Sequence, residues 1–321
     1  MKSFFKSKIT NPVFVCILAC FCCLLWGSAF PVIKIGYKAL DISSADYMSQ
    51  ILFAGVRFTV SGILTLVMGA VLTKSAVKVG RKGLYKIPVL SLFQTILQYL
   101  FFYIGLAKTT GTKGSIVNST SVFFSVIIAS LFLKQEKLTV KKGIGCMLGF
   151  AGAVAVNLTS ADTFGDMSFL GEGFIVLSAL SYAISSVLIK LFSKSESPVA
   201  LSGWQFLFGG IVMIITGLIF GGRLHFESMG SVLIVLYLAL LSAVAYTLWG
   251  ILLKYNKVSG VTVYSFMTPV FGCVLSALLL NEGLLDNAVK TIVALALVCF
   301  GIFLVNKEKK YEGKNDTRQG I

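Results

Sequence analysis

Ten apolar runs, separated by short basic or turn-forming segments, divide this chain of 321 residues from one end to the other. A helix of about 20 apolar residues crosses the ~30 Å hydrocarbon core of a bilayer. Charged residues make up 13% of the sequence, whereas soluble domains carry about 25%. We therefore predict an all-α membrane protein with ten transmembrane helices in the lipid bilayer. The runs cover approximately residues 13–33, 48–72, 87–107, 114–133, 142–158, 170–191, 201–220, 231–253, 260–280 and 288–305.

The distribution of Lys and Arg predicts how these helices are oriented. If the amino terminus lies inside, 21 of the 28 basic residues fall in inside segments and 6 fall in outside segments. Basic residues concentrate in cytoplasmic loops, so we expect both termini in the cytoplasm, with a charged tail over residues 307–321. This orientation accounts for the net charge of +15 without nucleic acid as a partner.

The two halves of the chain, residues 13–157 and 170–306, repeat each other at nearly constant intervals of 146 to 149 residues. Each half contains five runs, and an odd number of crossings inverts the second half relative to the first. Two inverted five-helix repeats around a central cavity suit transport by alternating access. The matching pairs include Phe58 and Phe206, Gly62 and Gly210, Gly69 and Gly217, Gly114 and Gly260, Ser119 and Ser265, Gly152 and Gly301, and Asn157 and Asn306.

Three segments carry a resemblance to a known family. They are Trp26-Gly27-Ser28-Ala29-Phe30 in the first run, 132–138 at the end of the fourth, and 268–284 in and after the ninth. In this order the segments resemble the EamA family of the drug/metabolite transporter superfamily. The sequence departs from that family where Phe123 replaces a proline that the second half keeps as Pro269.

The resemblance implies ten helices around a central cavity that the first, third, fourth, sixth, eighth and ninth helices line. It also implies that the protein carries small organic metabolites, usually outward, across the bacterial plasma (inner) membrane. Amino acids and related compounds are the substrates that it favours.

Polar side chains recur at helical spacing in most of these runs, where each needs a partner or a wet cavity. We expect them to line a substrate cavity together with the aromatic residues of the first run. Hydrogen bonding between helices is the alternative for each. The candidates are Trp26, Ser28, Phe30, Gln94, Gln98, Tyr103, Asn118, Ser121, Tyr182, Ser185, Tyr246, Trp249, Tyr264 and Thr268.

Three charged residues are candidates for a gate or an intramembrane charge. Arg57 lies well inside the second run, where it either binds a substrate carboxylate or phosphate or is structural, bonded to backbone carbonyls or a helix end. Glu136 and Glu282 lie at run ends on opposite faces of the membrane. They either remain solvated at the interface or cap helix termini, as gate residues would.

The runs hold no Asp, Glu or His deep in the membrane, so they predict no catalytic acid–base pair, no metal site and no cofactor. The Gly145–Gly149 segment is a small-xxx-small motif, which packs against the tenth run or forms a homodimer contact. We therefore expect a secondary transporter of a small metabolite that works by alternating access. A passive membrane channel and a membrane-embedded enzyme acting on lipid are the alternatives.

Overall fold

Helices make up all the regular structure that the computed structural model describes, which covers residues 7–43, 45–109, 111–133, 136–157, 168–280 and 288–307. The first half contains α2 (Pro12–Ala39), α3 (Tyr47–Thr73), the turn η1 (Arg81–Gly83), α4 (Lys86–Ser91), η2 (Leu92–Leu97), α5 (Gln98–Lys108), α6 (Gly111–Asn118), α7 (Ser121–Phe132) and α8 (Val140–Asn157). The second half contains η3 (Phe169–Gly173), α9 (Phe174–Phe192), α10 (Pro198–Ile219), α11 (Met229–Tyr255), α12 (Val258–Thr262), η4 (Val263–Phe266), α13 (Met267–Leu280) and α14 (Ala288–Lys307).

Six helical stretches in the described ranges are long and apolar enough to cross a membrane, and two shorter apolar helices accompany them. Large apolar side chains cover their outer surfaces, where Phe220 is 68% exposed and Leu72 is 84% exposed. Such a surface suits hydrocarbon rather than water. The protein is a multi-pass, all-α membrane protein, which confirms the fold class that the sequence predicts.

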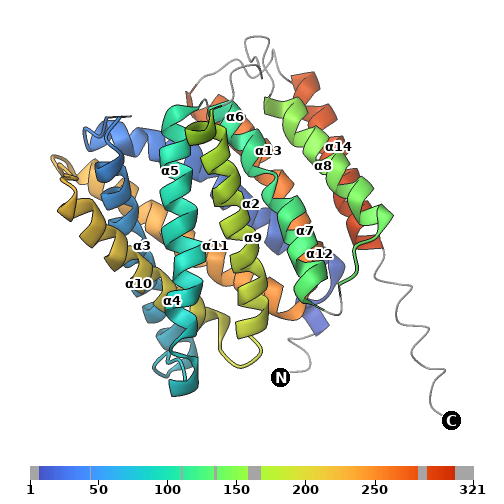
Figure 1. The fold of residues 1–321 in the computed structure, drawn as a ribbon, viewed down its shortest axis with the longest axis horizontal. Coiled ribbons are helices and arrows are strands. Elements are labelled where there is room, and N and C mark those ends of the chain that lie inside the picture. The colour runs from blue at the N-terminus through green and yellow to red at the C-terminus, as the bar shows by residue number, and fades with distance from the viewer. Residues whose placement is uncertain are drawn as a thin grey trace.

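Polar residues at the ends of the apolar runs determine where several helices begin. Asn11 caps α2, because its Oδ1 accepts a hydrogen bond from the Val13 amide at 2.9 Å, and Pro12 then starts the helix. Asp46 caps α3 through the Ser49 amide at 2.9 Å. These side chains bond amide groups that have no partner within a helix. The start of α2 and the end of α14 lie on the same face of the bundle (Figure 1), as an even number of crossings requires.

Helices α3 and α10 pack antiparallel across a pseudo-two-fold axis. A Cβ atom added to Gly62 would lie 2.8 Å from the Gly203 carbonyl oxygen, and one added to Gly210 would lie 2.9 Å from the Gly55 carbonyl oxygen. Gly55 and Gly62 match Gly203 and Gly210 at the 148-residue interval, so each contact is the mirror of the other. The contact moves from Gly55 to Gly62 along α3 as it moves from Gly210 back to Gly203 along α10, so the two helices are antiparallel. Equivalent helices that run in opposite directions show that the two halves are inverted.

The same relation holds for α8 and α14. A Cβ atom on Gly152 would lie 2.7 Å from the Ala294 carbonyl oxygen, and one on Gly301 would lie 2.5 Å from the Gly145 carbonyl oxygen. Gly145 and Gly152 match Ala294 and Gly301 at the 149-residue interval. Because Gly145 faces α14, the small-xxx-small motif packs against the tenth run within the chain.

The remaining long helices form equivalent neighbours in the two halves. α2 packs against α13 and α11, and α9 packs against α7 and α5. Gly27 permits the approach of α13, since a Cβ atom there would lie 2.9 Å from the Gly272 amide nitrogen. Gly27 of the first motif is therefore a point of close helix approach.

The fourth run breaks into α6 and α7 although it lacks the proline that its counterpart has. Residues 119 and 120 form a turn, in which the Thr120 amide donates to the Val117 carbonyl at 3.0 Å and the Thr120 hydroxyl donates to the same oxygen at 2.6 Å. Hydrogen bonds from residue i to residue i−3 tighten a helix locally. The second half breaks at the equivalent place, between α12 and α13, so the interruption belongs to the repeat and not to Pro269 alone.

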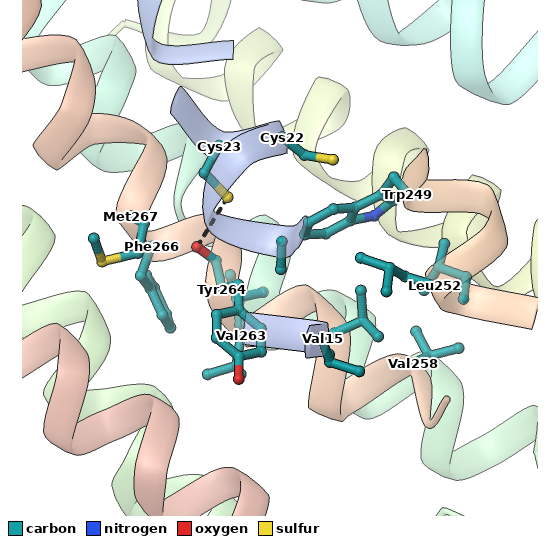
Figure 2. Packing of buried hydrophobic residues seen from close by; sticks show 14 of the residues in the cluster. Val15, Cys22, Cys23, Trp249, Leu252, Val258, Val263, Tyr264, Phe266 and Met267 are labelled. Carbon is teal, nitrogen blue, oxygen red and sulfur yellow. Dashed lines mark hydrogen bonds between the residues drawn. The ribbon is translucent and has the colours of Figure 1, made fainter. Parts of the chain in front are cut away.

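The largest apolar cluster surrounds the N-terminal half of α2 and joins the two repeats. Cys22 and Cys23 are fully buried in it, and the Cys23 thiol donates to the Tyr264 carbonyl at 3.2 Å. Figure 2 shows these residues beside Trp249, Phe266 and Met267. The cysteines in this cluster pack as small apolar side chains.

Candidate functional site

Four aromatic residues from three helices meet at the centre of the bundle. Trp26 of α2 contacts Tyr246 and Trp249 of α11, with ring centres 5.2 and 4.9 Å apart, and Tyr182 of α9 at 6.4 Å. All three contacts are edge-on, which aromatic quadrupoles favour. The residues that the sequence singles out in the first, sixth and eighth runs are therefore brought together.

The cluster continues to the pseudo-two-fold axis. The Tyr246 hydroxyl is 2.7 Å from the hydroxyl of Tyr99, which lies 147 residues earlier, and the Tyr246 ring contacts Phe206 at 5.0 Å. Phe206 in turn stacks on Phe58, its own counterpart in the repeat, with ring centres 5.1 Å apart. Equivalent residues that touch each other lie on the axis, so the aromatic cluster spans the junction between the halves.

Many buried polar atoms at this junction have no hydrogen-bond partner in the described part of the chain. Burying such an atom without a partner costs free energy, and native proteins keep few of them. Gln94 lies in η2, a π-helical turn, and such turns are frequent at functional sites. The junction therefore retains hydrogen-bonding capacity for a ligand or water. The unpartnered atoms include Trp26 Nε1, Gln94 Oε1 and Trp249 Nε1. Gln98, Tyr103, Tyr182 and Thr268 make only weak polar contacts, with Tyr246, Arg57, Ser265 and Cys23 respectively.

Arg57 of α3 lies within this junction and is 2% exposed. Its Nε and Nη2 both donate to the Ser242 hydroxyl of α11, at 3.2 and 2.9 Å, and its guanidinium carbon is 4.9 Å from the centre of the Phe58 ring. Nη1 has no partner among the described residues. Among the described residues, Arg57 therefore donates to a side-chain hydroxyl of another helix, whereas a purely structural arginine would use a backbone carbonyl or a helix end.

Several candidates lie apart from this junction. Ser28 pairs with the Tyr237 hydroxyl at 2.7 Å, and Tyr237 is 40% exposed. The Ser185 hydroxyl donates to the Tyr182 carbonyl of its own helix at 2.8 Å, and Tyr264 offers its carbonyl to Cys23. Asn118 and Ser121 flank the turn between α6 and α7. The Phe30 side chain and Glu282 lie outside the described residues.

Glu136 is buried and caps a helix of the other half, so it is not a solvated interface residue. Its carboxylate accepts hydrogen bonds from the Val258 amide, from the Ser259 amide at 2.9 Å and from the Ser259 hydroxyl at 2.7 Å. The amides at the start of α12 have no partner within the helix, and a negative charge there is favourable. Glu136 therefore ties the end of α7 to the start of α12.

A model of the EamA-like transporter family matches two segments of the chain, residues 13–158 and 169–307. The chain belongs to the EamA-like transporter family. The two matched segments correspond to the two sets of helices that the antiparallel packing relates.

Proteins similar to this family member come from plants and bacteria. A chloroplastic WAT1-related protein of Arabidopsis thaliana is 27% identical over 288 residues, which cover 86% of this chain and 67% of that protein. The uncharacterized transporter YetK of Bacillus subtilis is 28% identical, over 81% of this chain and 79% of that protein. The uncharacterized inner membrane transporter YedA of Escherichia coli is 27% identical, over 93% and 92%.

A crystal structure shares the fold, with a TM-score of 0.73 and 17% identity over 92% of this chain and 96% of that one. The names of the relatives point to transporters rather than enzymes. In the described ranges, no group of three or more His, Cys, Asp or Glu residues could hold a metal ion.

Sequence reasoning missed two tyrosines at the junction of this EamA-like protein. Tyr99 follows Gln98 and lies one turn before Tyr103, a spacing that could have added it to the candidates. Tyr37 lies beyond the predicted limit of the first run at residue 33, but α2 continues to Ala39. Its ring contacts Phe53 at 5.5 Å and Tyr103 at 6.4 Å.

Proposed function

We propose that this membrane transporter is a secondary carrier of small organic metabolites that works by alternating access. The observation that carries the proposal is the set of unpartnered buried polar atoms at the junction of the two inverted halves. A substrate that reached this junction would satisfy them, and two inverted halves can exchange conformations that are close in energy. The aromatic residues would contact the apolar part of the substrate.

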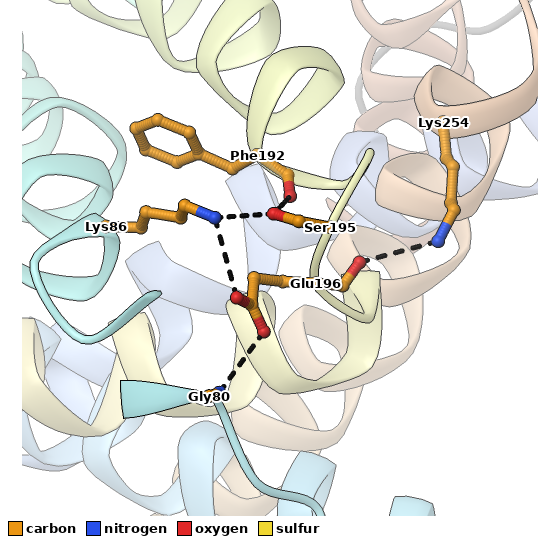
Figure 3. A network of polar contacts seen from close by, with 6 residues as sticks. All are labelled: Gly80, Lys86, Phe192, Ser195, Glu196 and Lys254. Carbon is orange, nitrogen blue, oxygen red and sulfur yellow. Dashed lines mark hydrogen bonds and ion pairs between the residues drawn. The ribbon is translucent and has the colours of Figure 1, made fainter. Parts of the chain in front are cut away.

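Contacts between the halves support a closed face in this conformation. Lys86 of the first half forms an ion pair with Glu196 of the second half at 3.5 Å and donates to the Ser195 hydroxyl (Figure 3). Within the second half, Lys254 donates to the Glu196 carbonyl at 3.4 Å and holds this segment in place. Together with the Glu136 cap, these bonds lie on the face where α2 begins. We infer that they must part before a substrate can reach the junction from that side.

The direction and location of transport follow from the same proposal. The concentration of Lys and Arg on the face where α2 begins favours a cytoplasmic position for both termini. The bacterial relatives support a bacterial plasma membrane as the location. Export of an amino acid or related compound is the activity that we propose, because the sequence resemblance favours it. Reporter fusions at each terminus would test this topology, because a terminus outside the cell would contradict it.

Purified protein in proteoliposomes gives the direct test of carrier function. We expect uptake of at least one compound from an amino-acid and metabolite panel to saturate and to accelerate when the unlabelled compound is present on the opposite side. A linear flux without this acceleration would indicate a channel, and turnover of lipid by the purified protein would indicate an enzyme. Either result would overturn the proposal.

The three tryptophans provide a matched set of variants for the same assay. Trp26→Ala and Trp249→Ala should lower flux per inserted molecule, since both rings lie at the junction. Trp204→Ala is the control, because Trp204 is 37% exposed on α10 and its Nε1 donates to the Val77 carbonyl at 3.0 Å. Normal flux in both junction variants would remove the tryptophans from the substrate path.

A further inference from the structure

The charge of Arg57 has no carboxylate counter-ion in the described part of the chain. Among those residues the one ion pair joins Lys86 and Glu196, and the partner of Arg57 is a neutral hydroxyl, Ser242. An unpaired buried charge is strongly destabilising. Retaining it at the centre of the molecule is explained most simply if a ligand supplies the negative charge.

The repeat contains an internal comparison for this position. Gln205 occupies the place of Arg57 in the second half, 148 residues later. The Thr95 hydroxyl donates to Gln205 Oε1 at 2.6 Å, just as Arg57 pairs with Ser242, and Ser242 follows Thr95 by 147 residues. A neutral amide thus meets the same packing demand on the other side of the axis. The fold itself does not require a cation at this position, so the charge needs another explanation.

Several tyrosine hydroxyl groups lie near the guanidinium of Arg57. Its field reaches the hydroxyls of Tyr37, Tyr99, Tyr103 and Tyr246. Tyr99 and Tyr246 bond each other, whereas the hydroxyls of Tyr37 and Tyr103 face each other and Arg57 without a hydrogen bond of good geometry among the described residues. Two phenol donors and the free Nη1 group therefore converge on one place, as recognition of an anion requires.

We propose that Arg57 binds the carboxylate of the transported metabolite, with Tyr37 and Tyr103 donating to the same group. This inference rests on the proposed carrier function and names its substrate class, a small organic monoanion with an apolar or aromatic body. One cation balances one negative charge, and the cation that acts on Tyr37 and Tyr103 is Arg57. A phosphate dianion would leave one buried charge unpaired.

The aromatic residues next to Arg57 fit the uncharged part of such a ligand. Phe58 lies under the guanidinium, Phe206 stacks on Phe58, and Tyr246 connects Phe206 to Trp26. This continuous aromatic surface begins at the cation and ends at the two tryptophans. A ligand with a carboxylate at Arg57 and an apolar body along the aromatic surface would match both parts of the site.

Thermal unfolding of the full-length protein in nanodiscs tests the proposal with paired probes. The carboxylates are acetate, butanoate and 3-phenylpropanoate, each matched by its neutral carboxamide, and phenyl phosphate represents dianions. We expect 3-phenylpropanoate to raise the midpoint more than its amide and more than phenyl phosphate, since a ligand that binds the folded state stabilises it. Amides that match every carboxylate, or stronger stabilisation by phenyl phosphate, would overturn it.

Variants at the site complete the test. Arg57→Gln copies the neutral residue of the second half and should weaken carboxylate binding at least about tenfold, as loss of one partner of a buried charge pair does. Arg57→Lys keeps the charge without the planar fork and should bind with intermediate affinity. Tyr103→Phe removes one donor and remains informative if Arg57→Gln does not fold. Ser61→Ala, in the same helix and equally buried, is the control.

Failure of this inference can be told apart from failure of the carrier proposal. If the wild-type protein shows saturable counterflow of neutral or cationic metabolites and Arg57→Gln transports them normally, the carrier stands and the anion site falls. If carboxylates bind with Arg57-dependent affinity but no compound shows counterflow, the site stands and the carrier proposal falls. Equal affinity of the wild type and Arg57→Gln for 3-phenylpropanoate would overturn the inference directly.

Discussion

Replacing Gly62 with alanine should separate α3 from α10 and destabilise the protein. The added Cβ atom would lie 2.5 Å from the Leu207 amide nitrogen, 2.8 Å from the Gly203 carbonyl oxygen and 2.9 Å from the Leu207 Cα atom. Favourable contacts to carbon begin near ~3.5 Å, so α10 would have to retreat by about 1 Å. All three atoms belong to the backbone, so no side-chain rotation can relieve the clash.

The expected cost follows from that displacement. Overpacking of a well-packed interface costs about 1–3 kcal/mol, and in a bilayer the retreating helices gain no compensating burial, because lipid is as apolar as the side chains. Gly210→Ala should cost a similar amount, since its Cβ atom would lie 2.4 Å from the Thr59 amide nitrogen. The double variant should cost less than the sum of the two, because one separation relieves both clashes.

Gly143→Ala is the matched control for these variants. Gly143 lies in α8, is exposed, and an added Cβ atom would meet nothing within 4 Å. Alanine is about 0.8–1 kcal/mol more favourable than glycine in a helix, so this variant should be neutral or stabilised. Thermal unfolding in nanodiscs measures all four proteins. A Gly62→Ala midpoint equal to that of Gly143→Ala would refute the close antiparallel packing on which the inverted fold depends.

Two other changes test the ends of helices. Glu136→Ala leaves the Val258 and Ser259 amides without their partner, which should lower stability by about 1–3 kcal/mol in the same unfolding assay; an unchanged midpoint would show that the cap contributes nothing. Although burial alone raises the pKa of Asp46, hydrogen bonds from Ser49 hold that pKa below its ordinary value of 3.8. A lowered pKa in the folded state stabilises the protein above the unfolded-state pKa, and this contribution is lost as the pH falls through the folded-state value. Asp46→Asn should therefore reduce the loss of stability between about pH 5 and pH 3. Asp41→Asn, at an exposed position, is the control. If the Asp46→Asn variant lost as much stability in acid as the wild type, this reasoning would be contradicted.

The fold could be predicted because its determinants are long and repeated. Long apolar runs indicate membrane helices directly. Glycines such as Gly62 and Gly210 recur at one interval because the same backbone contact occurs twice. The break between α6 and α7 was not predictable from proline, since local hydrogen bonds at Thr120 produce it. The burial of Glu136 was equally hidden, because its partners lie more than 120 residues away at the start of α12.

The junction was predictable in its aromatic part and not in its polar part. Trp26, Tyr182, Tyr246 and Trp249 stand out by residue type and spacing, and the structure brings them together. Ser28 is as polar as the residues of the junction, but its hydroxyl pairs with that of Tyr237, which is 40% exposed. Spacing along one helix gives the shared face of two residues, whereas the direction of that face depends on helix rotation, which only the packing determines.

The departures from symmetry are where specific chemistry is expected to lie. Phe58 with Phe206 and Tyr99 with Tyr246 are like residues that meet on the axis, and they would contact each other in the same way if the two halves exchanged roles. Arg57 and Gln205 differ by a full charge, so such an exchange moves a cation to one side of the axis and a neutral amide to the other. Two conformations with equivalent backbone packing then place the Arg57 charge in different surroundings. A ligand that neutralises it can shift their populations only through its differential affinity for them, which links recognition at Arg57 to the choice between the two states.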